Sequence, residues 1–312
     1  MKSKRAFSLI ELSIVIMIVG ILIAGVTQGY SLLGKMKLAS ARSITQGSPA
    51  ISIYGLALWL DATSEKAFSP NLSNQDPVSR WNDSNPQQSS KSDAVAVAAA
   101  PNFAQMPNYV SRGINGLPTL RCDGSNNSIL SITPNSNYFS DVTPTITNNF
   151  TIFLVAQATE AHEIDTQSDT GVGGTSGQKY ILGATQGGSQ YGDDTIAGMG
   201  VSFGTNGISI YEHSSFYMPS VLTYEATLSA PIIITINYSE KVPTILINGS
   251  LVKTGSPSLK NLVFPSVTLC SGQYGAFTGD IGEIIVYSKE VNASKRKQIE
   301  KYLGKKWGIK VS

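Results

Sequence analysis

Residues 12–27 read LSIVIMIVGILIAGVT, sixteen consecutive positions without a charged side chain. Between Phe7 and Leu33 the sequence contains one charge, that of Glu11. About 20 apolar residues in a helix cross the hydrocarbon core of a bilayer. Small residues recur along the stretch, and such residues let helices in lipid approach closely. The sequence therefore predicts one membrane-spanning helix near the N-terminus.

A basic segment precedes this helix. Residues 1–5 contain three Lys or Arg side chains, which favours keeping the N-terminus in the cytoplasm. Lys35, Lys37 and Arg42 follow the span and weaken that signal. An ordinary signal anchor is one interpretation. A secretory signal peptide fits less well, because the apolar run exceeds about 7–15 residues and no A-x-A cleavage site closes it.

Glu11 distinguishes these interpretations. A carboxylate inside an apolar helix costs free energy, although less near the end of the span than at its centre. The span itself contains no Lys or Arg that could pair with it. A simple anchor has no use for this carboxylate, so we expect its cationic partner to come from elsewhere.

The segment KRAFSLIEL at 4–12, followed by SIVIMIVGILIAG at 13–25, resembles the N-terminus of type IV prepilins and pseudopilins. The resemblance covers roughly residues 1–45. It implies cleavage between Ala6 and Phe7 by a prepilin peptidase, with N-methylation of Phe7. It also implies that Glu11 attracts the N-terminal amine of a neighbouring pilin subunit, because opposite charges attract strongly where the dielectric is low.

One residue departs from the family pattern. Ala6 stands where the family usually has Gly. Both residues are small, so we still expect processing. The predicted organisation is a leader at 1–6, a transmembrane and assembly helix at 7–45, a linker at 46–54 and an outer domain at 55–312. Residues 43–49 are predicted to form a short flexible joint, since the residue before Pro49 is pushed away from helical geometry.

The outer domain has the pattern of many short strands. Residues 150–156 and 231–238 are apolar and rich in β-branched side chains, which is typical of strands buried on both faces. Asn248-Gly249 between two apolar runs predicts a β-hairpin with a type I′ turn. Further strands are predicted at 117–122, 180–183, 197–204, 207–211, 266–270 and 281–287.

A short helix is predicted near the C-terminus, at 293–303. Asn292 is a favourable N-cap, and Gly304 suits the residue after the helix. Trp307 and Ile309 are then expected to pack against the sheets. The fold class is therefore mainly β, with an N-terminal transmembrane helix, an antiparallel β-sandwich and a short C-terminal helix.

The outer domain resembles laminin-G-like and concanavalin A-like jelly-roll domains. The motifs that carry this resemblance are LWLDA at 58–62, VSRWND at 78–83, NGLPTLRCDG at 115–124, TGDIGEIIVY at 278–287 and IEKYLGKKWGI at 299–309. The resemblance implies a lectin-like head, but a fold does not fix a ligand.

Enzymatic chemistry is not predicted. Glycosidases need a close pair of carboxylates on one face, and Asp280 and Glu283 are expected to face opposite ways on a regular strand. His162 and His213 lie in polar stretches without a second His at useful spacing, and we expect both in surface loops. The predicted protein is therefore not an enzyme.

No cofactor is certain, although Ca²⁺ is possible because hard cations bind clustered oxygens. The candidate ligands are Asp193 and Asp194, and next the stretch from Asp165 to Asp169. The tyrosines Tyr191, Tyr211 and Tyr217 are candidates for exposed contacts with a ligand. The three tryptophans, Trp59, Trp81 and Trp307, are expected to pack in the interior or at its rim.

Cys122 and Cys270 are the two cysteines, and an oxidising compartment would favour a disulfide between them. The basic side chains of 295–310 are expected to be a solvated helix face. The formal net charge of +2 gives no reason to expect nucleic acid as a partner.

These observations predict a single-pass protein of a bacterial cytoplasmic membrane, with its outer domain periplasmic or extracellular. It would assemble, as a minor or tip subunit, into a type IV pilus or a type II secretion pseudopilus. Its head would display an adhesive surface, for example for glycans. The alternatives are a structural envelope protein without a ligand and a surface polysaccharide hydrolase.

Overall fold

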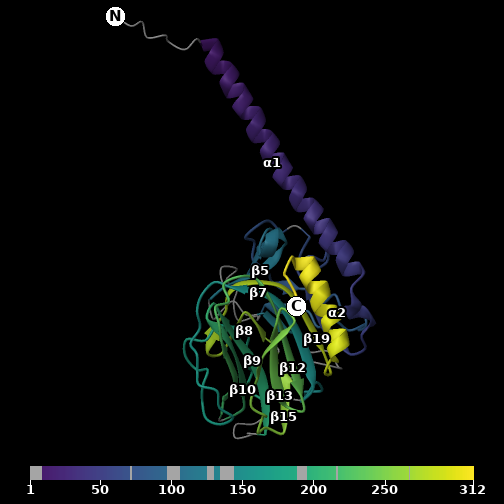
Figure 1. Cartoon of the computed structure of the whole chain (residues 1–312), viewed down its shortest axis with the longest axis vertical. Coiled ribbons are helices and arrows are strands. Elements are labelled where there is room, and N and C mark those ends of the chain that lie inside the picture. Colours follow the sequence, from purple (N-terminus) through teal and green to yellow (C-terminus); the bar gives the residue numbers. More distant parts are fainter. Residues whose placement is uncertain are drawn as a thin grey trace, which may run out of the picture.

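The computed structural model describes residues 9–70, 72–96, 106–124, 130–133, 144–187, 195–215, 217–266 and 268–312. Helix α1 (Leu9–Gln46) projects from a β-rich head, and its C-terminal part lies against that head (Figure 1). The short 3₁₀ helix η1 (Pro49–Ser52) follows. The remaining described elements form two packed sheets, a small hairpin of β17 (Ser271–Gly272) and β18 (Gly275–Ala276), the 3₁₀ turn η3 (Ile114–Gly116) and the C-terminal helix α2 (Ala293–Trp307).

The first sheet lies next to the helices. Its strand order is β14-β13-β12-β7-β19-β5-β4, with β1 also paired to β19. Its strands are β1 (Leu56–Asp61), β4 (Asn108–Val110), β5 (Thr119–Asp123), β7 (Phe150–Ala158), β12 (Ile232–Ser239), β13 (Val242–Ile247), β14 (Ser250–Thr254) and β19 (Thr278–Tyr287).

The second sheet packs against the first. Its order is β11-β10-β9-β8-β16-β6-β3-β2, with β15 paired in parallel to β9. Its strands are β2 (Arg80–Trp81), β3 (Ala94–Ala96), β6 (Leu130–Ile132), β8 (Tyr180–Leu182), β9 (Ile196–Gly204), β10 (Gly207–His213), β11 (Ser220–Glu225), β15 (Leu262–Pro265) and β16 (Thr268–Leu269). The predicted two-sheet sandwich is confirmed.

Strand β7 shows why the first sheet is apolar on both sides. Ile152 and Leu154 join the core between the sheets. Phe153 and Val155, which alternate with them, join a second cluster under α1 and α2. Because side chains alternate across a strand, a continuous apolar run fits a sheet covered on both faces, as the sequence predicted.

The hairpin prediction is also confirmed. Strands β13 and β14 pair in antiparallel, with Ile247 opposite Ser250. Asn248 and Gly249 between them have φ angles of 50° and 86°. Both positive values are those that a type I′ turn requires.

The strand predicted at 266–270 is present as the shorter β16, and β15 just before it was not predicted. The chain forms β15 before Ser266 and β16 after it. The two strands have different partners, because β15 pairs with β9 whereas β16 pairs with β6 and β8. The Ser266 hydroxyl donates to the Gly183 carbonyl at 2.6 Å and fixes the change of partner.

The predicted start of α2 is confirmed, and its predicted end is wrong. The Asn292 side chain accepts a hydrogen bond from the Lys295 amide at 3.0 Å. The helix continues through Gly304 and ends at Gly308, whose φ is 65°. A Cβ at Gly304 would lie 2.6 Å from Val311, so this glycine allows close packing rather than a turn.

The joint between α1 and the head, predicted to be flexible, is packed in the structure. Ser48 caps η1 by accepting from the Ala50 amide at 3.1 Å. Ala50 and Ile53 are buried, and the Tyr287 hydroxyl donates to the Ala50 carbonyl at 2.9 Å. The prediction rested on the effect of Pro49 on the residue before it, which the sequence shows, whereas the tertiary contacts of this segment do not appear in the sequence.

A disulfide joins Cys122 and Cys270. Cys122 belongs to β5 of the first sheet, and Cys270 follows β16 of the second. The bond therefore crosses the core and links the two sheets. The sequence could not show that these two strands are neighbours.

Candidate functional site

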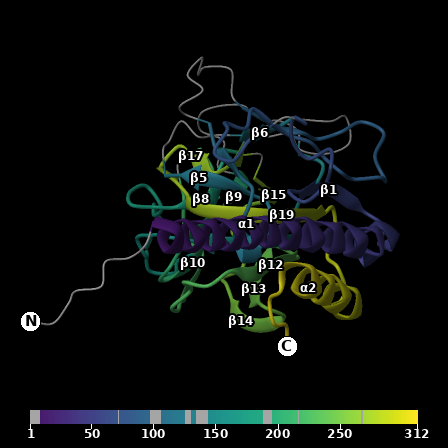
Figure 2. The same cartoon turned by 90° about the horizontal axis from the view of Figure 1, so that it is seen from above.

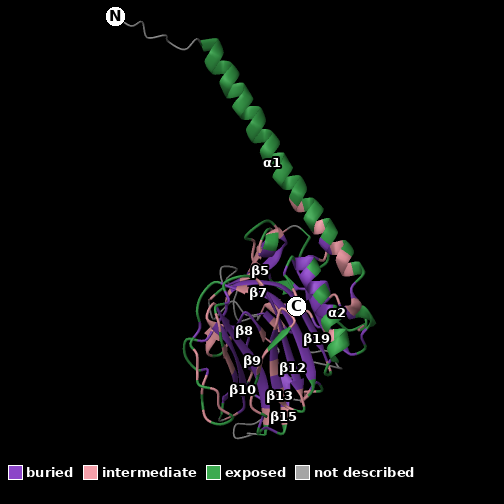
Figure 3. Cartoon of the chain, in the orientation of Figure 1, coloured by how far each residue is buried: buried purple, intermediate pink, exposed green. Residues whose placement is uncertain are grey.

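The exposed part of α1 is the first candidate site. Its large apolar side chains from Leu9 to Leu33 are between 47% and 86% exposed (Figure 3). Within the described residues α1 is the one helix long and apolar enough to cross a membrane. The predicted cleavage residues Ala6 and Phe7 lie outside the part of the chain that the structure describes.

The second half of α1 is fixed to the head by polar contacts. The Arg42 guanidinium donates to the Thr63 carbonyl at 2.8 Å and pairs with Glu65 at 2.9 Å. On the head, Arg112 reaches back along the helix and donates to the Tyr30 carbonyl at 3.1 Å. Helix α2 lies beside α1 over the same sheet face (Figure 2).

A buried ionic centre lies where the two helices meet the first sheet. The ammonium group of Lys306 is 2.7 Å from a carboxylate oxygen of Asp61 and 2.7 Å from one of Glu283. All three side chains are almost completely buried. Burial raises the pKa of Glu283, whereas the nearby Lys306 lowers it. The three groups come from β1, β19 and α2.

Neutral donors complete this centre. Glu283 accepts hydrogen bonds from Trp59 Nε1 at 2.8 Å, Trp307 Nε1 at 2.8 Å and the Tyr302 hydroxyl at 2.7 Å. The Thr45 hydroxyl of α1 donates to Asp61 at 3.2 Å. Helix α1 therefore takes part directly in the buried centre.

The expected burial of all three tryptophans is confirmed. Trp59 and Trp307 donate to the ionic centre, and Trp81 lies in the core between the sheets. None of the three is available to stack on a sugar.

The predicted orientation of Asp280 and Glu283 is wrong. A bulge in β19 between Ile281 and Glu283 shifts the register against β7, so both acidic side chains point away from the inter-sheet core. Gly282 in this bulge leaves room for the Trp307 ring, 2.6 Å from where its Cβ would be. Asp280 pairs with Arg121 at 2.7 Å, and Glu283 is enclosed, so the two do not form an open catalytic pair.

The basic C-terminal stretch is only partly a solvated face. Lys301, Lys305 and Lys310 are exposed, as expected, but Lys306 is buried. Glu300 is also buried, and it accepts from the Thr235 hydroxyl at 2.9 Å. The prediction of a solvated face is therefore wrong for Lys306 and Glu300, whose buried partners lie on distant strands.

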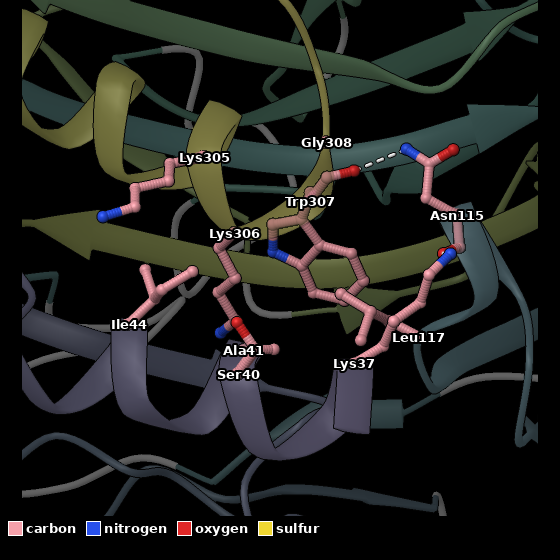
Figure 4. A pocket seen from close by; sticks show the side chains of 10 residues that line it. All are labelled: Lys37, Ser40, Ala41, Ile44, Asn115, Leu117, Lys305, Lys306, Trp307 and Gly308. Atoms are coloured by element: carbon pink, nitrogen blue, oxygen red, sulfur yellow. Dashed lines mark hydrogen bonds between the residues drawn. The ribbon is translucent and has the colours of Figure 1, made fainter. Parts of the chain in front are cut away.

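Two of the cavities beside α1 lie where it leaves the head, and a third, of about 130 Å³, is lined by Leu38, Arg42 and Glu65 among others. One of about 190 Å³ lies between α1 and α2, lined by Lys37, Ala41, Lys305 and Trp307 among others (Figure 4). The other, of about 260 Å³, lies on the other side of the 3₁₀ turn η3 (Ile114–Gly116). A wider groove of about 410 Å³ lies elsewhere on the head, between 175–179 and the hairpin that contains Tyr274.

Both histidines were wrongly expected at the surface. His162 is buried, its Nδ1 lies 2.9 Å from the Ser202 hydroxyl, and burial lowers its pKa to about 4. His213 is buried too, with its Nδ1 2.9 Å from the Ala184 carbonyl, and burial lowers its pKa. Ser202 is completely buried and also accepts from the Lys179 amide, so the His162–Ser202 pair is structural.

The residues predicted to contact a ligand differ in their exposure. Tyr211 is buried, contrary to expectation, and its hydroxyl donates to Asp165 at 2.7 Å. Tyr217 is 44% exposed, with the Lys260 ammonium 5.1 Å from its ring centre. Tyr191, Asp193 and Asp194 lie outside the described ranges.

The described residues offer no cluster of ligands for the calcium ion that the sequence suggested. Asp165 already accepts from the Gly174 amide, Gln178 and Tyr211. Among the residues that the structure places, no three His, Cys, Asp or Glu side chains are grouped as metal ligands.

Glu212 is a buried carboxyl group in β10. It accepts from the Tyr238 hydroxyl at 3.1 Å and from the Ser258 hydroxyl. Burial raises its pKa from 4.5 to about 7, against the lowering effect of these hydrogen bonds. The sequence analysis did not single out Glu212, although its alternation with Ile208 and Ile210, which join the core between the sheets, places it on their face of β10.

The N-terminus matches a known protein family motif. Residues 1–27 match the prokaryotic N-terminal methylation motif. The chain has a prepilin-type N-terminus. No curated protein matches the chain.

Similar solved structures cover the head. The binding domain of botulinum neurotoxin DC in complex with SialylT is 13% identical, with a TM-score of 0.43, over 80% of this chain and 51% of that one. A Trypanosoma rangeli sialidase with 2,3-difluorosialic acid is 15% identical, with a TM-score of 0.40, over 81% and 33%. Domain 4 of a Geobacillus stearothermophilus arabinanase with arabinotriose is 12% identical, with a TM-score of 0.38, over 79% and 97%. The chain thus spans about half of the first structure and a third of the second.

The buried ionic centre predicts that replacing Lys306 destabilises the protein far more than replacing its neighbour Lys305. Lys306→Met leaves Asp61 and Glu283 buried without their cation, and we expect it to lower the free energy of unfolding by about 3–5 kcal/mol. Lys305→Met, on the exposed side, should change it by less than about 0.5 kcal/mol. Denaturant unfolding of both full-length variants in detergent measures the difference. Equal stabilities would contradict the role given to Lys306.

Glu212 predicts a pH dependence of stability. Its folded pKa of about 7 exceeds the ordinary value of 4.5, so between these values the folded state binds more protons than the unfolded state. The free energy of unfolding must therefore fall as pH rises through this window. Relative to Glu212→Gln, we expect the wild type to lose up to about 3 kcal/mol between pH 4 and pH 8. Glu225→Gln, at an exposed position of β11, is the control, and parallel pH profiles for wild type and Glu212→Gln would refute the assignment.

Proposed function

We propose that this chain is a pilin-like subunit that a prepilin peptidase cuts between Ala6 and Phe7 and methylates at Phe7. The subunit spans the cytoplasmic membrane once, with its head on the outer side. It then joins a type IV pilus or a type II secretion pseudopilus through α1.

The observation that carries this proposal is the methylation motif followed directly by an unburied apolar helix. From Leu9 to Leu33 the large apolar side chains are 47% or more exposed, and the head reaches this stretch through the hydrogen bond from Arg112 to the Tyr30 carbonyl. No other described atom lies within 4 Å of where a Cβ would be at Gly20, Gly25 or Gly29. Such a surface is unfavourable in water. In the proposal it contacts lipid before assembly and the helices of neighbouring subunits after assembly.

Glu11 gives this helix a specific partner. In the proposal its carboxylate attracts the methylated amine of Phe7 on a neighbouring subunit. Both charges lie in a medium of low dielectric, where their attraction offsets the cost of desolvation. The pairing sets the axial position of one subunit against the next.

A minor or tip position suits the size of the head. The described head comprises two sheets and α2, and it is wide relative to the single helix that carries it (Figure 1). Heads of this width would crowd one another along a tightly packed filament. We therefore place the subunit at low copy number or at the tip.

The assembly proposal predicts a separation between processing and incorporation. Mass spectrometry should find a mature N-terminus at methylated Phe7 in both the wild type and Glu11→Ala. Incorporation of Glu11→Ala into filaments should fall by more than about tenfold, because the incoming amine loses its counter-ion. Glu225→Ala, at an exposed position of the head, is the matched control and should assemble normally. An intact Met1 in the purified wild type, or normal filament yield from Glu11→Ala, would refute the proposal.

A glycan-binding head is the second part of the proposal. The groove of about 410 Å³ combines the aromatic ring of Tyr274 with the polar side chains of Thr175, Gln178, Lys179 and Gln273. An aromatic face with several hydrogen-bonding groups is the chemistry that binds sugars.

A glycan array with the full-length protein in detergent tests this second part. We expect binding that Tyr274→Ala reduces by about tenfold or more, since one aromatic contact is worth roughly 1.5 kcal/mol. Tyr54→Ala, at an 80% exposed tyrosine outside the groove, is the control. No binding to any glycan would favour a structural envelope protein, and release of reducing sugar would favour a hydrolase.

A further inference from the structure

Four exposed cations lie close together where α1 leaves the head. Lys35 and Lys37 belong to α1, Lys305 belongs to α2, and Arg112 lies on the head. We call Lys35, Lys37, Arg112 and Lys305 the basic collar. Lys35 and Arg112 line the cavity of about 260 Å³ on one side of η3. Lys37 and Lys305 line the cavity of about 190 Å³ on the other side, where Figure 4 shows both side chains beside the opening between the helices.

The collar is not neutralised within these cavities. Of the described residues that line them, none is an Asp or a Glu. Lys306 also contributes to the second cavity, but its charge is already held by Asp61 and Glu283. The positive charge of the collar is thus available to an anion from outside the chain.

The collar lies at the level of the lipid headgroups if α1 spans the membrane. Leu9 to Leu33 covers about 36 Å at 1.5 Å per residue, slightly more than the hydrocarbon core of about 30 Å. Tyr30 is 62% exposed near the outer end of this span, where tyrosines favour the interface. Arg112 donates to the Tyr30 carbonyl, so the rim of the head descends to the same depth.

The packing around Gly34 keeps Arg112 at this depth. A Cβ at Gly34 would lie 3.2 Å from the Arg112 guanidinium, so any larger residue would press that side chain outward. Arg112 therefore lies across the helix and beside Lys35, at the edge of the cavity that they share.

Lys and Arg residues on the outer side of a membrane span weaken the charge asymmetry that orients the span, so their presence here calls for an explanation. Lys35 and Lys37 follow the span and oppose the basic residues of 1–5, which hold the N-terminus in the cytoplasm. Basic groups close to an anionic leaflet each strengthen the attraction by about fivefold. A lipid phosphate is an anion of suitable size for a cavity flanked by Lys and Arg.

We propose that the basic collar binds the phosphates of anionic phospholipids on the outer face of the cytoplasmic membrane. This inference rests on the membrane insertion of α1 in the proposed function. The bound lipids hold the head upright on the bilayer before assembly, and extraction of α1 into a filament removes them.

The test uses the full-length protein in mixed micelles that contain equal amounts of phosphatidylglycerol and phosphatidylcholine. Native mass spectrometry counts the retained molecules of each lipid. We expect the wild type to be enriched in phosphatidylglycerol. Replacing all four collar residues by Gln should reduce that enrichment by about fivefold or more. The control replaces four cations away from the collar by Gln, namely Lys66, Lys253, Lys295 and Lys297, and should keep it.

Flotation with phosphatidylcholine vesicles at alkaline pH separates the two levels of the argument. A wild type that does not float refutes insertion of α1, and the collar proposal with it. A wild type that floats but retains both lipids equally refutes the collar alone. Unchanged enrichment in the collar variant also refutes it, and defective assembly with unchanged lipid enrichment would assign these cations to contacts between subunits.

Discussion

The ammonium group of Lys306 lies between the carboxylates of Asp61 and Glu283, with water excluded from all three. A buried carboxylate is costly unless it is paired and hydrogen-bonded, and here each one is. The groups belong to β1, β19 and α2, and Thr45 adds α1. The rest of the structure depends on this centre, because it is where the sheet and both helices are held in one position.

The two parts of α1 have different surroundings, and the buried centre anchors the part that lies on the head. The first part of α1 exposes apolar side chains on all sides, while its last turns pack on the first sheet through Ala41 and Ile44. A flexible joint would let the head rotate about the stem. The caps and contacts of η1, the Arg42 interactions and the buried centre prevent such rotation. These contacts set the direction of α1 relative to the head.

The structure also explains why acidic residues in the head do not indicate catalysis. Glu283 and Asp280 share a sheet face because of the bulge at Gly282, which superficially resembles a paired-carboxylate site. One is covered by α2 and the other is held by Arg121, so neither faces an open cleft. Burial of Glu212 likewise raises its pKa, and its carboxyl group accepts hydrogen bonds from the Tyr238 and Ser258 hydroxyls. In this head the buried charges fix the packing of strands and helices.

Features that depend on residues close together in the chain can be predicted from the sequence. The apolar run of α1, the methylation motif, the doubly buried β7, the Asn248-Gly249 turn and the Asn292 cap all follow from local pattern. Only the tertiary structure decided the end of α2, the packed joint after α1, and the burial of His162, His213 and Tyr211. It also brought Trp59 to Glu283, 224 positions away, and placed Arg112 beside the stem. Local periodicity tells which side chains must leave water, but the partner of a buried charge depends on which distant strands and helices become neighbours, and no short stretch of sequence contains that information.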